Sequence, residues 1–239
     1  MPGILVLKNN ALVIPKGGFQ ISLYGESTIQ VHIEYDVCPT WLEISAKHLN
    51  EAKTYYNKAI NIDSFKDKRK AENIEFSFRA SMQAIIATTI AFDALYSNLR
   101  ARMILPVELL TSWKKNGTAR YATVSEIIRR ALNLGNDCSQ SLREQLKEFY
   151  RFRDAAVHPR GTSTPPVLFA EIDALVEQRY VEFRYDNAHQ AVKAATQIVH
   201  DLANKGKPAN RELDHYIASL SPRIELLRKD CGLFEEPAT

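Results

Sequence analysis

The segment IEFSFRASMQAIIATTIAFDALYSNLRARM occupies residues 74–103 and is the longest stretch of the chain with a helical pattern. Large, mostly apolar residues recur in it at alternating spacings of four and three, which places them on one face of an α-helix. That face carries Phe78, Met82, Ile85, Thr89, Phe92, Tyr96, Leu99 and Met103. Ile86 and Ile90 widen this stripe. We therefore expect the helix to lie at the centre of a bundle.

Composition agrees with a helical protein. The chain has 239 residues, of which 45% are hydrophobic and 25% are charged, as in ordinary globular proteins and unlike disordered ones. It contains 9 glycines, whereas average usage would give about 17 in this length. Few glycines favour helices over a turn-rich sheet protein.

Charge and cysteine usage exclude several classes. The 31 basic and 28 acidic residues give a net charge of +3, too mild by itself to indicate nucleic-acid binding. Cys38, Cys138 and Cys231 are far apart and match neither a disulfide framework nor a zinc site. The most apolar stretch, residues 84–95, contains Asp93 and is shorter than a bilayer span. We expect a soluble cytoplasmic protein with reduced thiols, no metal and no membrane partner.

The first part of the chain has the pattern of strands. Residues 4–8 and 11–14 flank Asn9-Asn10, a pair that suits a tight hairpin. Residues 19–24 and 28–35 follow, and apolar side chains alternate with polar ones in the second of them. We expect a small N-terminal β element.

The remainder has helical periodicity, interrupted by the charged residues 66–70, which we expect to form a turn. Besides residues 74–103, the helices expected are 41–62, 106–115, 123–134, 141–158, a stretch from about 167, 187–204 and 221–229. Ser141 and Glu144 have capping-box spacing, and Ser221-Pro222 is typical of a helix start. The fold class expected is mainly α, with a β element at 1–37 and a helical bundle at 38–239.

Several motifs that would identify an enzyme class are missing. The sequence has no Gly-x-Gly-x-x-Gly, P-loop, Gly-x-Ser-x-Gly or His-Glu-x-x-His motif. Their absence argues against nucleotide-dependent dehydrogenases, P-loop kinases, typical α/β-hydrolases and zincins.

One helix breaks its own apolar pattern. The stripe through Leu142, Leu146 and Phe149 continues to positions 153 and 156, and position 153 is arginine. An arginine on a buried stripe is costly unless it is paired, or lines a cleft or an interface. His158 follows at the expected helix end, where the negative end of the helix dipole favours a protonated imidazole.

Arginine held beside histidine suits phosphodiester chemistry. Histidine can move the proton of a ribose 2′-hydroxyl near neutral pH, and arginine can stabilise the charge of the crowded phosphate. The basic side chains of Arg143, Lys147, Arg151 and Arg160 could extend a phosphate-binding surface, of which Arg151 and Arg160 are the RNA-binding candidates.

The segment RDAAVHP at residues 153–159 resembles the motif of the HEPN superfamily of helical-bundle domains. Its ribonuclease members carry Arg, four to six residues, then His near a helix end. The resemblance covers residues 41–204 and excludes the N-terminal strands. It implies an antiparallel bundle that dimerises, bringing two motifs into one cleft. Arg153, Asp154 and His158 would be the catalytic residues, although Asp154 replaces the commoner Asn.

The function implied by this resemblance is a metal-independent endoribonuclease that needs no cofactor. Such proteins often serve as toxins or in phage defence, with RNA as substrate and a cognate inhibitor protein as a further partner. The alternative is a non-catalytic helical module that binds a protein or nucleotide. A third hypothesis is a structural dimer without a small ligand.

Other roles for the same residues remain open at the sequence level. Arg153 could form a structural ion pair with Asp93, Glu148 or Asp154, and His158 could be a helix C-cap. Spacing alone does not decide, because Arg184 and His189 have the same separation.

Overall fold

The computed structural model describes residues 36–62, 68–158 and 165–230, together with the backbone of four short N-terminal strands. These strands form two antiparallel pairs, β1 (Leu7–Lys8) with β2 (Ala11–Leu12) and β3 (Gln20–Tyr24) with β4 (Thr28–His32). Lys8 pairs with Ala11 and Leu7 with Leu12, whereas Asn9-Asn10 lies outside the described residues. The expected N-terminal strands are confirmed over these residues.

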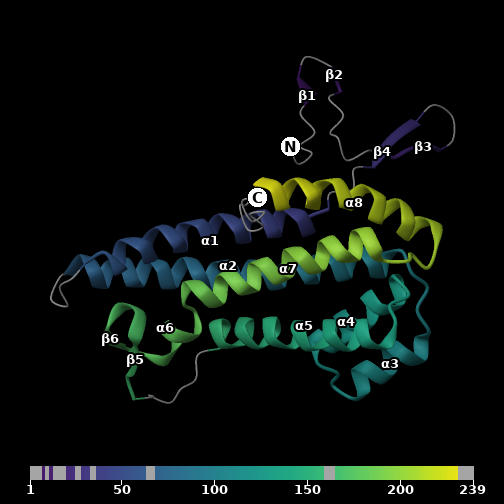
Figure 1. Ribbon diagram of the computed structural model, residues 1–239. Coiled ribbons are helices and arrows are strands. Elements are labelled where there is room, and N and C mark those ends of the chain that lie inside the picture. The colour runs from purple at the N-terminus through teal and green to yellow at the C-terminus, as the bar shows by residue number, and fades with distance from the viewer. Residues whose placement is uncertain are drawn as a thin grey trace, which may run out of the picture.

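The rest of the described chain is mainly helical (Figure 1). The helices are α1 (Cys38–Ile60), α2 (Lys68–Ala101), α3 (Val107–Lys115), α4 (Arg120–Ala131), α5 (Asn136–Val157), α6 (Gln178–Glu182), α7 (Tyr185–Lys205) and α8 (Arg211–Asp230). The mainly α class is confirmed.

Helix α2 is central, as its wide apolar stripe predicts, because α1, α4, α5 and α7 all pack against it. Ile85, Phe92 and Leu99 are fully buried. Polar side chains join the two longest helices, since the Ser45 and Thr88 hydroxyls lie 3.1 Å apart. Complete burial of a large apolar side chain contributes about 1.5–3 kcal/mol. The stripe on α2 therefore supplies much of the stability of the bundle.

Helix α5 runs antiparallel to α2 (Figure 1). Phe149 stacks on Phe92 with ring centroids 5.6 Å apart. Three residues further along α5, Phe152 meets Phe183, which also contacts Phe78 near the other end of α2. Moving forward along α5 therefore means moving backward along α2. These two helices are therefore antiparallel.

Helices α2 and α5 begin more than one turn earlier than expected. Helix α2 begins at Lys68, inside the charged run expected to be a turn, where Lys68 and Glu72 form an ion pair one turn apart. Helix α5 begins after Gly135, which is its extended N-cap, so Ser141 and Glu144 lie inside the helix instead of forming a capping box.

The expectation of a helix from residue 167 is wrong. That stretch forms a hairpin of β5 (Val167–Phe169) and β6 (Ala174–Val176), joined by the 3-10 turn Ala170–Ile172. Asp173 adopts a left-handed conformation with φ 48°, which ends the turn. Short apolar runs do not distinguish strand from helix by periodicity.

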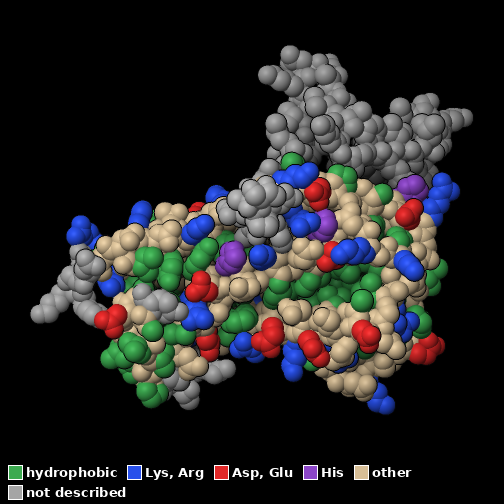
Figure 2. Space-filling model, in the orientation of Figure 1, with side chains coloured by type: hydrophobic (Ala, Val, Ile, Leu, Met, Phe, Trp, Pro, Cys, Tyr) green, Lys and Arg blue, Asp and Glu red, His purple; other side chains and the backbone are tan. Residues whose placement is uncertain are grey.

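Exposed Leu168 and Leu175 face each other across this hairpin, and hydrophobic side chains gather there in Figure 2.

The expected helix start at Ser221-Pro222 is also wrong. Helix α8 begins at Arg211 and continues through Pro222. Its cap is Asn210, whose side-chain oxygen accepts a hydrogen bond from the Leu213 amide at 2.9 Å.

Candidate functional site

A groove of about 500 Å³ lies between the start of α4 and the C-terminal half of α5. We call it the α4–α5 groove. Its lining residues are Ala119, Arg120, Tyr121, Lys147, Tyr150, Arg151, Arg153, Asp154, Ala155 and His158. The groove thus brings together the candidate site residues Arg151, Arg153, Asp154 and His158, together with Lys147 of the expected phosphate-binding surface. Arg143 of that surface does not line the groove, and Arg160 lies outside the described residues, as does Pro159.

Helical geometry explains why the α5 residues share one groove. Lys147, Tyr150, Arg151, Asp154 and His158 follow one another at spacings of three, one, three and four. These spacings keep their side chains on one face of the helix. Because the adjacent face carries buried Leu142, Leu146 and Phe149, the groove lies along the edge of the core.

Arg153 lies at this edge with 31% of its side chain exposed. Its Nε and Nη2 atoms donate to Asp154 Oδ1 at 3.0 and 2.7 Å. Its Nη1 atom is 3.9 Å from Asp93 Oδ2, and its guanidinium carbon lies 5.0 Å from the Tyr150 ring centroid. The arginine on the apolar stripe is therefore both paired and in a cleft, the two conditions that lower its cost.

Asp93 joins three helices at the wall of the groove. Its Oδ1 atom accepts hydrogen bonds from Arg120 Nε of α4 at 2.7 Å and from the Tyr150 hydroxyl of α5 at 2.6 Å. Its Oδ2 atom faces Arg153. The structural ion pair of Arg153 with Asp93 and Asp154, one of the alternatives open at the sequence level, is confirmed.

Tyr150 acts in this network as a hydrogen-bond donor. Burial raises the pKa of its hydroxyl well above the ordinary value, and the hydrogen bond to Asp93 adds to the shift. The phenol therefore keeps its proton at neutral pH and supports the Asp93 carboxylate.

His158 is exposed at the C-cap of α5, where its backbone N–H donates to the Asp154 carbonyl at 2.9 Å. The C-cap position expected from the sequence is confirmed. Within the described part of the chain, its imidazole has no hydrogen-bond partner. An exposed imidazole can accept a proton from a bound molecule or donate one to it.

The groove carries an excess of positive charge. Four cationic side chains line it, from Arg120, Lys147, Arg151 and Arg153, against one lining carboxylate, Asp154. Asp93 and Glu148 partly offset this excess, because Asp93 pairs with Arg120 at 2.7 Å and Glu148 forms an ion pair with Arg151 at 2.8 Å. On the face drawn in Figure 2, acidic and basic side chains are intermixed along α5.

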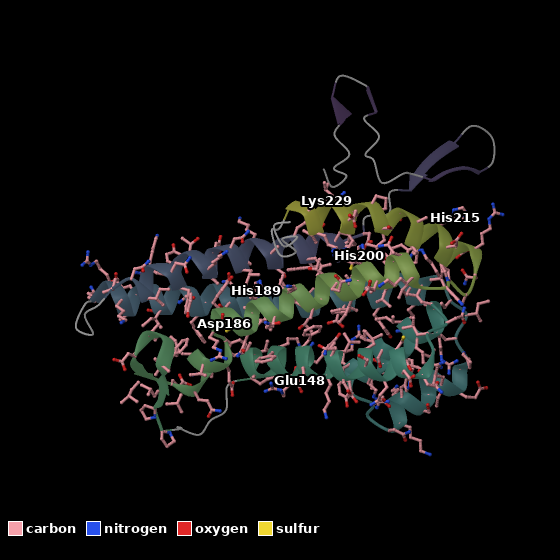
Figure 3. The ribbon with its side chains drawn as sticks, viewed as in Figure 1. Glu148, Asp186, His189, His200, His215 and Lys229 are labelled. Atoms are coloured by element: carbon pink, nitrogen blue, oxygen red, sulfur yellow. The ribbon has the colours of Figure 1, made fainter. Side chains whose placement is uncertain are left out.

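The second Arg–His pair has different surroundings. Arg184 is the N-cap of α7, where it borders a cavity of about 10 Å³, too small for a ligand. His189 lies on α7 beside Tyr185, and burial lowers its pKa, with a further contribution from Lys193. Figure 3 shows His189 and Asp186 on α7, apart from Glu148 on α5. Neither Arg184 nor His189 lines the α4–α5 groove.

Sequence reasoning missed Arg120, Tyr121 and Tyr150 as residues of the groove. Arg120 is 27 residues from Asp93 in sequence, and only the packing of α4 against α2 and α5 brings them together. Of these three residues, only Tyr150 could be predicted from local spacing. It lies three residues before Arg153, and residues three apart are neighbours on a helix surface.

No family model matches this chain, and no curated protein or solved structure matches it either. Within the described ranges, no group of three or more His, Cys, Asp or Glu side chains could hold a metal ion. Over the same ranges, none of the helices combines the length and apolar character needed to cross a bilayer.

Proposed function

We propose that this protein is a metal-independent endoribonuclease whose reacting groups are Arg153 and His158. The observation that carries the proposal is their shared position in one groove with an excess of positive charge. Cationic grooves attract the phosphate backbone of nucleic acids without regard to sequence. An exposed histidine in such a groove is placed to act on the ribose next to a bound phosphate.

The chemistry requires one proton acceptor and one proton donor. His158 takes the proton of the 2′-hydroxyl, whose oxygen attacks the neighbouring phosphorus. The bond from phosphorus to the 5′-oxygen breaks, and that oxygen receives a proton as it leaves. The products are a 2′,3′-cyclic phosphate and a 5′-hydroxyl end. Arg153 stabilises the negative charge that gathers on the phosphate during the reaction.

A homodimer supplies both histidines. One His158 serves as base and the partner's His158 as acid, while the two Arg153 side chains flank one phosphate. A two-fold axis beside the groove would generate this arrangement from a single motif per chain. We include in this proposal a role as a toxin or phage-defence effector that a cognate inhibitor protein blocks. This role rests on the motif alone.

The ion pair between Arg153 and Asp154 is compatible with phosphate binding. The Asp154 side chain is 56% exposed, and exposed ion pairs contribute about 0–1 kcal/mol. A phosphate entering the groove can therefore replace Asp154 as the partner of Arg153 at small cost.

Cleavage by the purified protein tests this proposal. Single-stranded RNA should be cut to fragments ending in 2′,3′-cyclic phosphate, and the rate should be unchanged in EDTA. Loss of cleavage in EDTA, or products ending in a 3′-hydroxyl, would contradict the mechanism.

One observation favours the second candidate, a non-catalytic helical module that binds a partner protein. In a single chain, the guanidinium of Arg153 is already paired with Asp154 and faces Asp93, as expected of a structural residue. Wild-type protein that cuts no RNA, after a missing trigger is excluded, would decide for this candidate.

A further inference from the structure

We propose that Arg120 is a second phosphate-contacting residue of the α4–α5 groove and that its ligand is single-stranded RNA. Arg120 stands at the first position of α4, across the groove from the motif on α5. The inference rests on the proposed function for the choice of RNA as ligand. It adds a residue outside the Arg–His motif and assigns Asp93 as the residue that positions it.

The structure holds the Arg120 guanidinium in one orientation. Its Nε atom donates to Asp93 at 2.7 Å, and its guanidinium carbon lies 3.9 Å from the Tyr96 ring centroid. Stacking on an aromatic ring and a charged hydrogen bond fix the plane of the group before a ligand arrives. A pre-ordered arginine loses little side-chain entropy when it binds phosphate.

Asp93 does not fully neutralise the positive charge of Arg120 and Arg153. One carboxylate faces two arginines, Arg120 and Arg153, and also accepts the hydrogen bond from Tyr150. Arg153 has Asp154 as an additional partner, whereas Asp93 is the carboxylate that contacts Arg120 over the described ranges. Over these ranges Arg120 therefore has one carboxylate partner, which it shares with Arg153, whereas Arg153 has two.

The lining of the groove fits a single strand. Single-stranded nucleic acids bind where cations follow the backbone and aromatic rings are available to the bases. The α4–α5 groove offers both, with four cations and the half-buried ring of Tyr121, whereas Tyr150 is buried and holds Asp93. Its volume of about 500 Å³ is in the range of sites for small ligands, which suits a short stretch of one strand.

Binding of a 2′-O-methyl oligoribonucleotide tests the inference without cleavage, because this probe lacks the attacking hydroxyl. We expect Arg120→Gln, which keeps a donor for Asp93 but loses the charge, to weaken binding about tenfold. The slope of log affinity against log salt should fall by about 0.7, the value for one phosphate contact on a single strand. Arg120→Lys should keep the slope of the wild type.

Arg100→Gln is the matched control. Arg100 also contacts Tyr96, donating to its hydroxyl at 3.0 Å, but it is exposed and does not line the groove. Its loss should leave the salt slope unchanged.

Three results would overturn the inference: no binding of the probe by the wild type, an unchanged slope in Arg120→Gln, or equal slope losses in Arg120→Gln and Arg100→Gln. Binding with the expected slope loss, but without cleavage of unmodified RNA, would support Arg120 as a contact. That combination would reject the proposed nuclease activity but not the contact between Arg120 and phosphate.

Discussion

At the scale of single residues, the polar contacts of the bundle centre on two aspartates. Asp93 connects α2, α4 and α5 at the groove. Asp36 has a similar role near the same end of α2, because its side chain accepts hydrogen bonds from the Cys38 amide, the Asn98 amide group and the Tyr216 hydroxyl. Asp36 thereby ties the start of α1 to α2 and α8.

Asp36 predicts a pH dependence of stability. Its burial raises its pKa above the ordinary value of 3.8, and its hydrogen bonds only partly oppose this. Between 3.8 and the raised pKa, the folded chain binds more protons at this site than the unfolded chain does, so its contribution to stability falls as pH rises. Asp36→Asn replaces the carboxyl group with an amide that does not titrate, so it removes this dependence of stability on pH. Urea unfolding should show the variant gaining stability relative to wild type as pH rises from about 4, and a relative loss would contradict this.

Part of the site could be predicted from residue patterns. Arg153 interrupts an apolar stripe, and an arginine there is costly unless it is paired or lines a cleft. The structure shows both, because Arg153 faces Asp93 and lines the α4–α5 groove. Arg120 gave no such signal. Its role depends on a contact between α4 and α2 that local patterns do not encode.

At the scale of elements, α8 shows how burial overrides a local helix breaker. Pro222 removes one backbone hydrogen bond and costs about 3 kcal/mol or more in a helix interior. The buried stripe of α8 lies on both sides of it and consists of Leu213, Tyr216, Ile217, Leu220, Ile224 and Leu227. Several buried apolar side chains at about 1.5–3 kcal/mol each outweigh that cost. This is why the local pattern at Ser221-Pro222 predicted a start that the bundle does not use.

The true start of α8 can be tested at its cap. Asn210→Ala removes the side-chain acceptor of the Leu213 amide and should lower the free energy of unfolding by about 1 kcal/mol. Asn210→Ser keeps a cap acceptor and, like Asn210→Ala, lacks the Nδ2 donor to the Arg102 carbonyl, so it should lose less. Ser221→Ala is the control, because Ser221 lies in the middle of α8 and, over the described residues, its hydroxyl donates to the exposed side chain of Asn204 alone. A larger loss in Ser221→Ala than in Asn210→Ala, measured by urea unfolding, would contradict this account.

Long, strongly periodic helices could thus be predicted, whereas helix ends and short elements could not. The stripe of α2 spans many turns and determines its central position. The β5–β6 hairpin has three residues in each strand, too few for a period to be recognised, and tertiary contacts decide its conformation.

At the scale of the whole molecule, the proposed mechanism requires two chains. One groove provides one Arg153 and one His158, whereas in-line cleavage uses a base and an acid on opposite sides of the phosphate. Light scattering at micromolar concentration should therefore give twice the chain mass of 27.1 kDa. A monomer at that concentration would instead favour the partner-binding module.

The most direct test of the central claim compares RNA cleavage by His158→Ala, His189→Ala and the wild type. His158 is exposed at a helix end, so its truncation should preserve the fold, as circular dichroism can verify. His189 has the same spacing from an arginine but lies outside the groove. We predict that His158→Ala abolishes cleavage of single-stranded RNA and that His189→Ala cuts at the wild-type rate. Cleavage that persists in folded His158→Ala would contradict the account.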